Sequence, residues 1–311
     1  MKIAIVGATS QIASDLILSM SIYSSYDLLL YARDTHRVDE WLRANKLTES
    51  YQVFDLYSYG EHSHDIVINF IGVGDPARAA EMGESIFDIT LHYDQMILAK
   101  LQDNPERQYI FISSGAVYGS DFEMPASLKT RATININSFT PTEYYSLAKL
   151  YAEGRHRALP NYNIVDVRVF NYLSNSLSMD ARFFIADIVR SVRDRKPFLT
   201  SNDAMVRDYL HPKDFFQLIH KIIASSHINK AIDCFSKKPI SKKEVLNLFK
   251  SEFGLKVKLS SSPWHINATG SKPNYFSVNY KASELGYLPQ YSSEECLLEF
   301  GMSLLNIKSS R

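Results

Sequence analysis

The chain opens with an apolar strand, a glycine turn and a helix in immediate succession. Lys2 to Val6 is a β-rich apolar run, Gly7 follows it directly, and Ile12 to Met20 is apolar at helical spacing. A helix that starts at a strand tip presents unpaired N–H groups and a positive dipole end, so this order predicts a phosphate site. Ser10 and Ala13 replace the second and third glycines of the G-x-x-G-x-x-G pattern, which leaves an ordinary tight turn as the alternative.

Strands and helices continue to alternate as far as residue 170. We expect strands at 2–6, 27–31, 51–54, 65–71, 108–113 and 164–170, with helices at about 80–101 and around Tyr145. Such alternation predicts the α/β class, with a Rossmann-like doubly wound parallel sheet. A sheet of this kind binds ligands beyond the carboxyl ends of its strands.

The sequence after residue 170 predicts a smaller C-terminal α/β lobe. Residues 182–195 are expected to form a helix, 206–223 to return to the sheet with another helix, and 231–235 to form a strand. Ser241 and Ser292 each precede a glutamate by three residues, which is the capping-box signature of a helix start. We therefore expect a dinucleotide-binding domain at 1–170, with about 205–235 returning to it, and a substrate-binding lobe at 171–204 and 236–311.

The composition excludes several classes of function. The 311 residues carry 34 basic and 34 acidic side chains, so no net charge attracts a nucleic acid. Cys234 and Cys296 are far apart and lack metal-ligand spacing, which predicts structural thiols in a reducing compartment and no metal site. The longest apolar stretch, about 66–73, is too short to span a bilayer, and the N-terminal run is expected to be a strand and not a signal peptide. We expect a soluble cytoplasmic protein with no membrane partner.

A tyrosine and a lysine lie four residues apart in the run YYSLAKLY, residues 144–151. If this run is helical, Tyr145 and Lys149 share one face. A phenol with a pKa near ~10 exchanges protons poorly at neutral pH, and an ammonium within about 4–6 Å would favour the phenolate. The tyrosine could then act as acid or base toward an alcohol or ketone, assisted by a hydroxyl from Ser114 or, as second choice, Ser113. The alternative is a helix whose lysine only covers apolar surface.

Further residues with a chemical use fall at the predicted carboxyl ends of the strands. Arg33 stands close to where a NAD site would place an acid, and an arginine there can hold a 2′-phosphate, which favours NADP. A surface arginine paired with Asp34 or Asp39 is the alternative. Asp55 would contact the amino group of adenine. The remaining strand-end residues are Gly7, Ser114, Asn171 and the run Gly72-Val73-Gly74.

Five motifs together resemble the extended short-chain dehydrogenase/reductases, which include NAD(P)-dependent nucleotide-sugar epimerases, dehydratases and reductases. The motifs are the Gly7 turn, ISSGAVYG (112–119), YYSLAK (144–149), RVFN (168–171) and RDYLHPKD (207–214). The resemblance covers nearly the whole chain.

The resemblance implies a catalytic triad of Ser114, Tyr145 and Lys149. In it Tyr145 is the acid/base, Lys149 lowers the pKa of that phenol and binds the nicotinamide ribose, and Ser114 orients the substrate oxygen. The resemblance also implies nucleotide-sugar contacts from Ser114, Asn171 and Arg207, the arginine through the diphosphate, and a homodimer in which the Tyr145 helix packs against its copy. The predicted cofactor-binding residues are Gly7, Thr9, Ser10, Gln11, Ile12, Arg33, Asp55, Leu56, Ile71, Gly72, Tyr145 and Lys149.

The sequence favours an NADPH-dependent reductase that acts on a keto group of a nucleotide-activated, deoxygenated sugar, with Tyr145 as acid/base. An NAD-dependent nucleotide-sugar epimerase is the alternative, and the choice depends on Arg33, because an epimerase regenerates its oxidised cofactor and usually holds NAD tightly. A 4,6-dehydratase is disfavoured, since the Asp-Glu pair of the resembling dehydratases is missing. A non-catalytic dinucleotide sensor is the third hypothesis, against which the retained tyrosine and lysine argue. His211 is expected to be a hydrogen-bonded loop residue and not a cleft residue.

Overall fold

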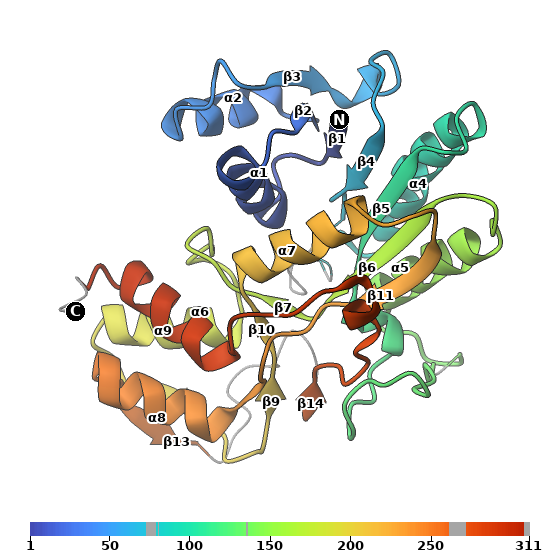
Figure 1. The fold of residues 1–311 in the computed structure, drawn as a ribbon. Coiled ribbons are helices and arrows are strands. Elements are labelled where there is room, and N and C mark those ends of the chain that lie inside the picture. Colours follow the sequence, from blue (N-terminus) through green and yellow to red (C-terminus); the bar gives the residue numbers. More distant parts are fainter. Residues whose placement is uncertain (73–78, 80, 135, 261–271, 308–311) are drawn as a thin grey trace.

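A computed structural model gives the fold and describes residues 1–72, 79, 81–134, 136–260 and 272–307 (Figure 1). The strands of the central sheet are β1 (Lys2–Val6), β2 (Asp27–Ala32), β3 (Gln52–Asp55), β4 (Ile66–Asn69), β5 (Gln108–Ser114), β6 (Ile164–Val169) and β11 (Asn229–Asp233). The short strands are β7 (Asn171–Tyr172), β8 (Phe198–Thr200), β9 (Val206–Arg207), β10 (Tyr209–Leu210), β12 (Ile240–Ser241), β13 (Val257–Leu259) and β14 (Asn274–Tyr275).

The helices separate these strands along the chain. They are α1 (Gln11–Tyr23), α2 (Thr35–Ala44), α4 (Ser85–Gln102), α5 (Pro141–Arg157), α6 (Phe184–Arg193), α7 (Pro212–Ile223), α8 (Lys242–Phe253) and α9 (Ser293–Leu304). Single 3₁₀ turns are η1 (Leu56–Ser58), η2 (Gly115–Tyr118) and η3 (Lys281–Leu285).

The central sheet has seven parallel strands in the order β11-β6-β5-β4-β1-β2-β3. In β1, Ile5 lies opposite Leu30 of β2 on one side and Ile68 of β4 on the other. The chain therefore runs from β1 outward to β3 and then in the opposite direction from β4 to β6, which is the doubly wound arrangement. Strand β11 joins beyond β6, with Lys230 opposite Val165. The predicted fold class is confirmed.

Helices cover both faces of this sheet, which explains why its central strands are buried and largely apolar. Alternate residues of β1 point to opposite faces, so Ile3 and Ile5 pack in the core with α1, α2 and α7. Ala4 and Val6 pack in the core with α4 and α5. The carboxyl ends of β1, β4 and β5 are consequently the part of the sheet that the helices leave open for a ligand.

A second apolar core lies in the C-terminal part of the chain. Helices α6, α8 and α9 meet there through side chains such as Ile188, Phe249 and Leu297, and Figure 1 shows them together on the side away from β1 to β3. Both predicted capping boxes are present, since the Ser241 and Ser292 hydroxyls accept the N–H groups three residues ahead.

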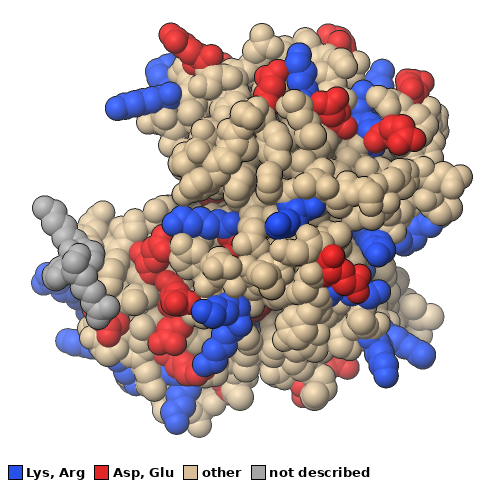
Figure 2. Space-filling view, viewed as in Figure 1, with Lys and Arg blue, Asp and Glu red and all other residues tan. Residues whose placement is uncertain are grey.

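Two expectations differ from the structure. Residues 206–223 do not return to the central sheet, because β9 and β10 pair in small separate sheets and β11 joins the central sheet instead. The other difference concerns the helix expected at about 80–101. In the structure α4 begins at Ser85, because Gly83 adopts a positive φ of 54° and a turn separates it from the preceding helical residues. Residue Ala80, like Val73 and Gly74 of the predicted strand-end run, lies outside the described residues. Within the described part of the chain, each helix is too short or too polar to cross a bilayer. Figure 2 shows acidic and basic side chains interspersed over one face of the molecule.

Candidate active site

The turn after β1 has the geometry of a phosphate site. Gly7 has a φ of 86°, and a Cβ on it would lie 3.1 Å from the backbone nitrogen of Ile71, so a side chain fits there neither conformationally nor sterically. The Ser10 hydroxyl caps α1 by accepting the Ala13 N–H at 3.4 Å and keeps its own proton for another acceptor. This helix start, with the backbone of β4 close behind it, fits the pyrophosphate of a dinucleotide.

The two serines at the end of β5 face different surroundings. The Ser113 hydroxyl donates to Glu153 at 2.6 Å, and that carboxylate also accepts from Arg168, so Ser113 belongs to a buried ion network. The Ser114 hydroxyl accepts the Ala116 N–H at 3.1 Å and interacts with the phenol of Tyr145. Of the two serines, Ser114 is therefore the one that faces the tyrosine, as preferred from the sequence.

Helix α5 brings Tyr145 to the carboxyl end of β5. The Asn229 side chain holds the far end of this helix by donating to the carbonyls of His156 and Leu159 at 3.1 and 2.8 Å. Burial raises the pKa of Tyr145 in this structure, whereas the hydrogen bond with Ser114 lowers it. Burial is the dominant effect, and the lowering of this pKa by Lys149 stays a prediction.

Lys149 lies one helical turn from Tyr145, but its ammonium group points to the sheet. Its Nζ donates to the Ile112 carbonyl at 2.9 Å and lies 4.1 Å from the centre of the Phe111 ring. Burial lowers the pKa of Lys149 to about 8 against the attraction of nearby carboxylates. A Cβ on Gly72 would lie 3.1 Å from this Nζ, so the glycine leaves the room that the amine and a ligand beside it require.

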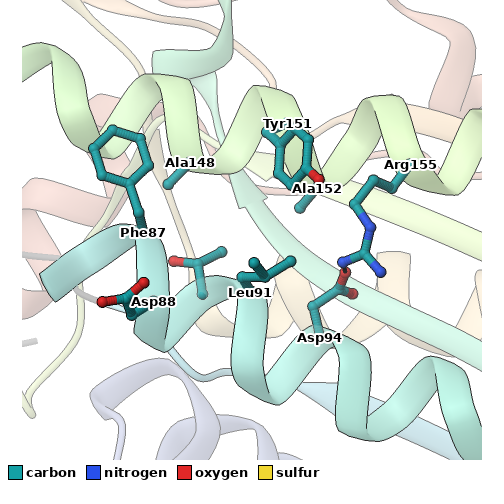
Figure 3. Close-up of a pocket in the computed structure, with 9 residues that line it drawn as sticks. Phe87, Asp88, Leu91, Asp94, Ala148, Tyr151, Ala152 and Arg155 are labelled. Atoms are coloured by element: carbon teal, nitrogen blue, oxygen red, sulfur yellow. Dashed lines mark hydrogen bonds and ion pairs between the residues drawn. The ribbon is translucent and has the colours of Figure 1, made fainter. Parts of the chain in front are cut away.

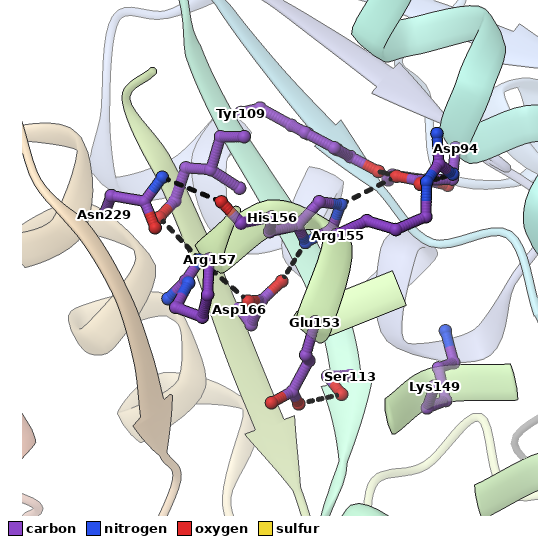
Figure 4. Close-up of polar contacts among 12 residues, drawn as sticks. Asp94, Tyr109, Ser113, Lys149, Glu153, Arg155, His156, Arg157, Asp166 and Asn229 are labelled. Carbon is purple, nitrogen blue, oxygen red and sulfur yellow. Dashed lines mark hydrogen bonds and ion pairs between the residues drawn. The ribbon is translucent and has the colours of Figure 1, made fainter. Parts of the chain in front are cut away.

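A network of buried charged side chains connects α5 to α4 and to β6 (Figure 4). His156, which is fully buried, contacts Asp166 of β6 at 2.6 Å and Asp94 of α4 at 2.8 Å. Asp94 also accepts from Arg155 at 2.7 Å and from Tyr109 at 3.0 Å. Burial alone would lower the pKa of His156, but the two carboxylates outweigh it and raise the pKa to about 9. These contacts fix α5 to α4 and to the sheet.

The end of the cleft beyond β2 contains Arg33 and Asp55. Arg33 is exposed, as the alternative of a surface arginine expects, but it makes no ion pair with Asp34 or Asp39 in the described part of the chain. Its role toward a cofactor stays a prediction. The Asp55 carboxylate accepts the Tyr57 N–H at 2.8 Å and thereby starts η1, which leaves one carboxylate oxygen for a ligand. Leu56 is buried.

The predicted substrate residues Asn171 and Arg207 lie on short strands of two separate small sheets, β7 and β9. Asn171 donates to the Asp208 carbonyl at 3.2 Å, and Arg207 donates to the Lys272 carbonyl at 2.7 Å. No sequence motif pointed to Lys272. Its ammonium lies 4.8 Å from the centre of the Tyr275 ring. Burial and, to a smaller extent, the charge of Arg207 lower the pKa of Lys272 to about 8. Arg207 also lies over the Tyr275 ring, at 5.9 Å. Arg207 and Lys272 therefore both contact the Tyr275 ring. They lie 65 positions apart in the chain, so no local motif marks the pair.

A family model described as the NAD dependent epimerase/dehydratase family matches residues 3–233, well over half of the chain. The chain belongs to this family. The resemblance to extended short-chain dehydrogenase/reductases drawn from the motifs is thereby confirmed.

Two epimerases from rice are similar to most of this chain. UDP-glucose 4-epimerase 2 from Oryza sativa subsp. japonica is 26% identical over 263 residues, which cover 74% of this chain and 60% of that protein. UDP-glucose 4-epimerase 4 from the same source is 27% identical over 262 residues, covering 74% of this chain and 67% of that protein. The chain therefore spans about three fifths of the first relative.

Solved structures of family enzymes have the same fold. UDP-glucose-4-epimerase from Stenotrophomonas maltophila, with bound NAD and formylated UDP-arabinopyranose, gives a TM-score of 0.81 at 16% identity and 98% coverage of both chains. UDP-glucuronic acid 4-epimerase from Bacillus cereus, in complex with UDP-glucuronic acid and NAD, gives 0.79 at 16% identity, with 98% of this chain and 99% of that chain covered. dTDP-glucose 4,6-dehydratase from Bacillus anthracis, in complex with NAD, gives 0.78 at 15% identity, covering 97% and 96%.

Two further features of this family member concern His211 and the surface between α4 and α5. His211 is buried, caps α7 by accepting the Lys213 N–H at 3.1 Å and stacks on Tyr291 at 3.8 Å, as expected for a hydrogen-bonded histidine. A pocket of about 180 Å³ opens between α4 and α5 (Figure 3). Its lining residues are Phe87, Asp88, Thr90, Leu91, Asp94, Ala148, Tyr151, Ala152 and Arg155. Helix α5 thus has Tyr145 near the carboxyl end of β5, and its Tyr151, beside this pocket, is 59% exposed.

Proposed function

We propose that this protein is an NAD-dependent epimerase of nucleotide-activated sugars. The proposal rests on the interaction between the Tyr145 phenol and the Ser114 hydroxyl. Lys149, whose amine is buried, lies one helical turn after Tyr145 on the same helix. The rice relatives are named UDP-glucose 4-epimerases, and the comparisons favour this alternative over the reductase that the sequence favoured. We assign residues 171–204 and 236–311 to substrate binding and the rest to the dinucleotide.

In this proposal each catalytic group has one task. Tyr145 takes the proton of a sugar hydroxyl and later returns it. Ser114 has one proton to donate, which bonds the Tyr145 phenolate first and the sugar oxygen once Tyr145 has taken the proton. Lys149, with its pKa lowered to about 8, would hold the ribose hydroxyls next to the nicotinamide. NAD, when bound, supplies the reversible hydride acceptor that an epimerisation through a ketone requires. The Gly7 turn and the start of α1 would hold its pyrophosphate. Asn171 would contact the sugar, and Arg207 with Lys272 would face the diphosphate.

Epimerase assays without added cofactor test this proposal. The purified protein is incubated with UDP-glucose, UDP-N-acetylglucosamine or UDP-glucuronic acid, and the products are followed by NMR. We expect interconversion of one C4 epimer pair with no net consumption of cofactor. A reaction that starts only with NADPH and consumes it in step with product would establish the reductase instead. No reaction in either assay would refute both.

Arg33 is the observation that keeps the NADPH-dependent reductase as a second candidate. It is exposed at the tip of β2, and no acid stands at Tyr31 or Ala32. We expect Arg33→Ala to weaken NADPH binding by about tenfold or more and to change NAD binding by less than about threefold, since only NADPH carries a 2′-phosphate. Titration calorimetry measures both constants. Arg37→Ala, which removes another exposed arginine on the following helix, is the control, and equal effects of the two variants on NADPH would contradict a phosphate role for Arg33.

We also propose that the protein is a homodimer that pairs the α4 and α5 surfaces. The support is the exposed aromatic surface of Tyr151 and Phe87 beside the pocket of Figure 3. We expect Tyr151→Glu to produce a monomer, because an isologous interface brings each substitution next to its copy. Light scattering gives the mass, and Tyr57→Glu, at an exposed tyrosine on η1, is the control. A monomeric wild-type protein would contradict the proposal.

A further inference from the structure

A second phenol lies close to Ser114. The hydroxyl of Tyr275, on β14, lies 3.4 Å from the Ser114 oxygen, and the two residues are 161 positions apart in the chain. Tyr275 is only 5% exposed, and its charge would raise the pKa of Tyr145. Ser114 therefore interacts with two tyrosine hydroxyls, those of Tyr145 and Tyr275.

The backbone around Tyr275 is held on two sides. Its strand pairs with β9, where Tyr275 lies opposite Arg207. On the other side, the Asn274 backbone N–H donates to the Phe122 carbonyl at 2.9 Å, and the Asn274 side chain donates to the Glu123 carbonyl at 2.7 Å. The Tyr275 ring packs edge-on against Phe122 at 4.9 Å. These contacts place the hydroxyl before any substrate binds.

The hydrogen-bonding capacity of Ser114 allows Tyr275 to be the donor in this contact. A serine hydroxyl has one proton and two lone pairs, and the Ala116 N–H occupies one lone pair. Burial raises the pKa of Tyr275, so this phenol keeps its proton at neutral pH and can donate to the second lone pair. The proton of Ser114 is then left for Tyr145 or for a substrate oxygen beside it.

We infer that Tyr275 is a positioning residue of the active site: it donates to Ser114 and thereby directs the Ser114 proton toward Tyr145. The inference rests on the proposed function for its catalytic meaning. A hydrogen bond donated to the Tyr145 oxygen favours the phenolate, which is the form that removes a proton from the sugar. Tyr275 would thus help Tyr145 to act as a base by orienting the group between them.

The test is Tyr275→Phe, which removes the hydroxyl and keeps the ring. We expect kcat to fall about tenfold at neutral pH with KM changed by less than about threefold, since one hydrogen bond of ordinary strength is lost. The rising limb of the kcat profile should move to higher pH, because the Tyr145 phenolate becomes harder to form. A second readout needs no turnover: in protein labelled at the tyrosine ζ-carbons, the NMR signal of Tyr145, assigned by its loss in Tyr145→Phe, should shift.

Tyr118→Phe is the matched control, because it removes a buried phenol of the same aromatic cluster whose bonds go to Asp233 and Arg168. It should lower stability and leave both the kcat profile and the Tyr145 signal in place. An unchanged Tyr145 signal in Tyr275→Phe overturns the inference, and so does a pH profile identical to that of the wild type. If the wild type epimerises none of the sugars, the proposed function fails, and the NMR signal alone decides the positioning role.

Discussion

Tyr145→Phe should lower kcat for sugar epimerisation by about a hundredfold or more while NAD affinity changes by less than about threefold. The substitution removes only the hydroxyl that exchanges the proton, and positioned acid/base groups contribute roughly 10²–10⁴ in rate. The ring remains to fill its place on α5, and Lys149 keeps its bond to the Ile112 carbonyl. Initial rates and calorimetric titration with NAD check the two parts of this expectation.

Tyr144→Phe is the appropriate control for this variant. Tyr144 is the preceding residue of the same helix, and its ring packs against Phe87 of α4 at 5.5 Å. It should keep the wild-type kcat. If Tyr145→Phe retained more than about a tenth of the wild-type rate, the proton would have to move through another group, and the proposed role of Tyr145 would be lost. A cellular function that survives the substitution would point to the sensor hypothesis instead.

The fold could be predicted because its signals are local. Strand β4 is fully buried and apolar from Ile66 to Ile68, and a strand of this kind in a chain that alternates strand and helix indicates a parallel sheet covered on both faces. The capping boxes at Ser241 and Ser292 join residues three apart, so they could be read directly from the sequence. The start of α4 was harder to place, since the turn depends on the conformation of Gly83.

The site could be predicted only in part, because its decisive contacts join distant residues. The four-residue spacing of Tyr145 and Lys149 placed both on one helix face, yet the ammonium bonds to a carbonyl 37 residues upstream. Tyr275 reaches Ser114 only through the pairing of β14 with β9. Arg33 led the sequence analysis toward NADPH and a reductase, whereas the relatives favour the epimerase, and one strand-tip residue did not suffice to choose between them.

His156→Leu should cost about 3–5 kcal/mol of unfolding free energy at pH 6, the second large effect expected of this chain. Both ring nitrogens of His156 face carboxylates, Asp94 and Asp166, and ionised carboxylates only accept hydrogen bonds, so the imidazole must carry two protons and a positive charge. Removing it leaves two buried carboxylates whose remaining partners are Arg155 and Tyr109 for Asp94 and Arg157 for Asp166. Urea unfolding followed by circular dichroism measures the change.

The same pair of contacts fixes how the stability of the wild type depends on pH. The pKa of His156 is raised from 6.5 to about 9 in the folded chain. A raised pKa contributes stability that is complete below pH 6.5 and is lost as the pH rises through about 9, here about 3 kcal/mol. Lys149 and Lys272 have lowered pKa values of about 8 and act with the opposite sign above that pH.

A comparison of the wild type with His156→Leu removes this opposing contribution, because both proteins keep the two lysines. The difference in unfolding free energy should therefore be largest near pH 6 and shrink steadily toward pH 9. His227→Leu, at an exposed histidine, should show a small difference with little pH dependence. A large but constant difference for His156→Leu would mean that the folded chain holds a neutral imidazole, and one carboxylate of the pair would then have to carry the proton instead.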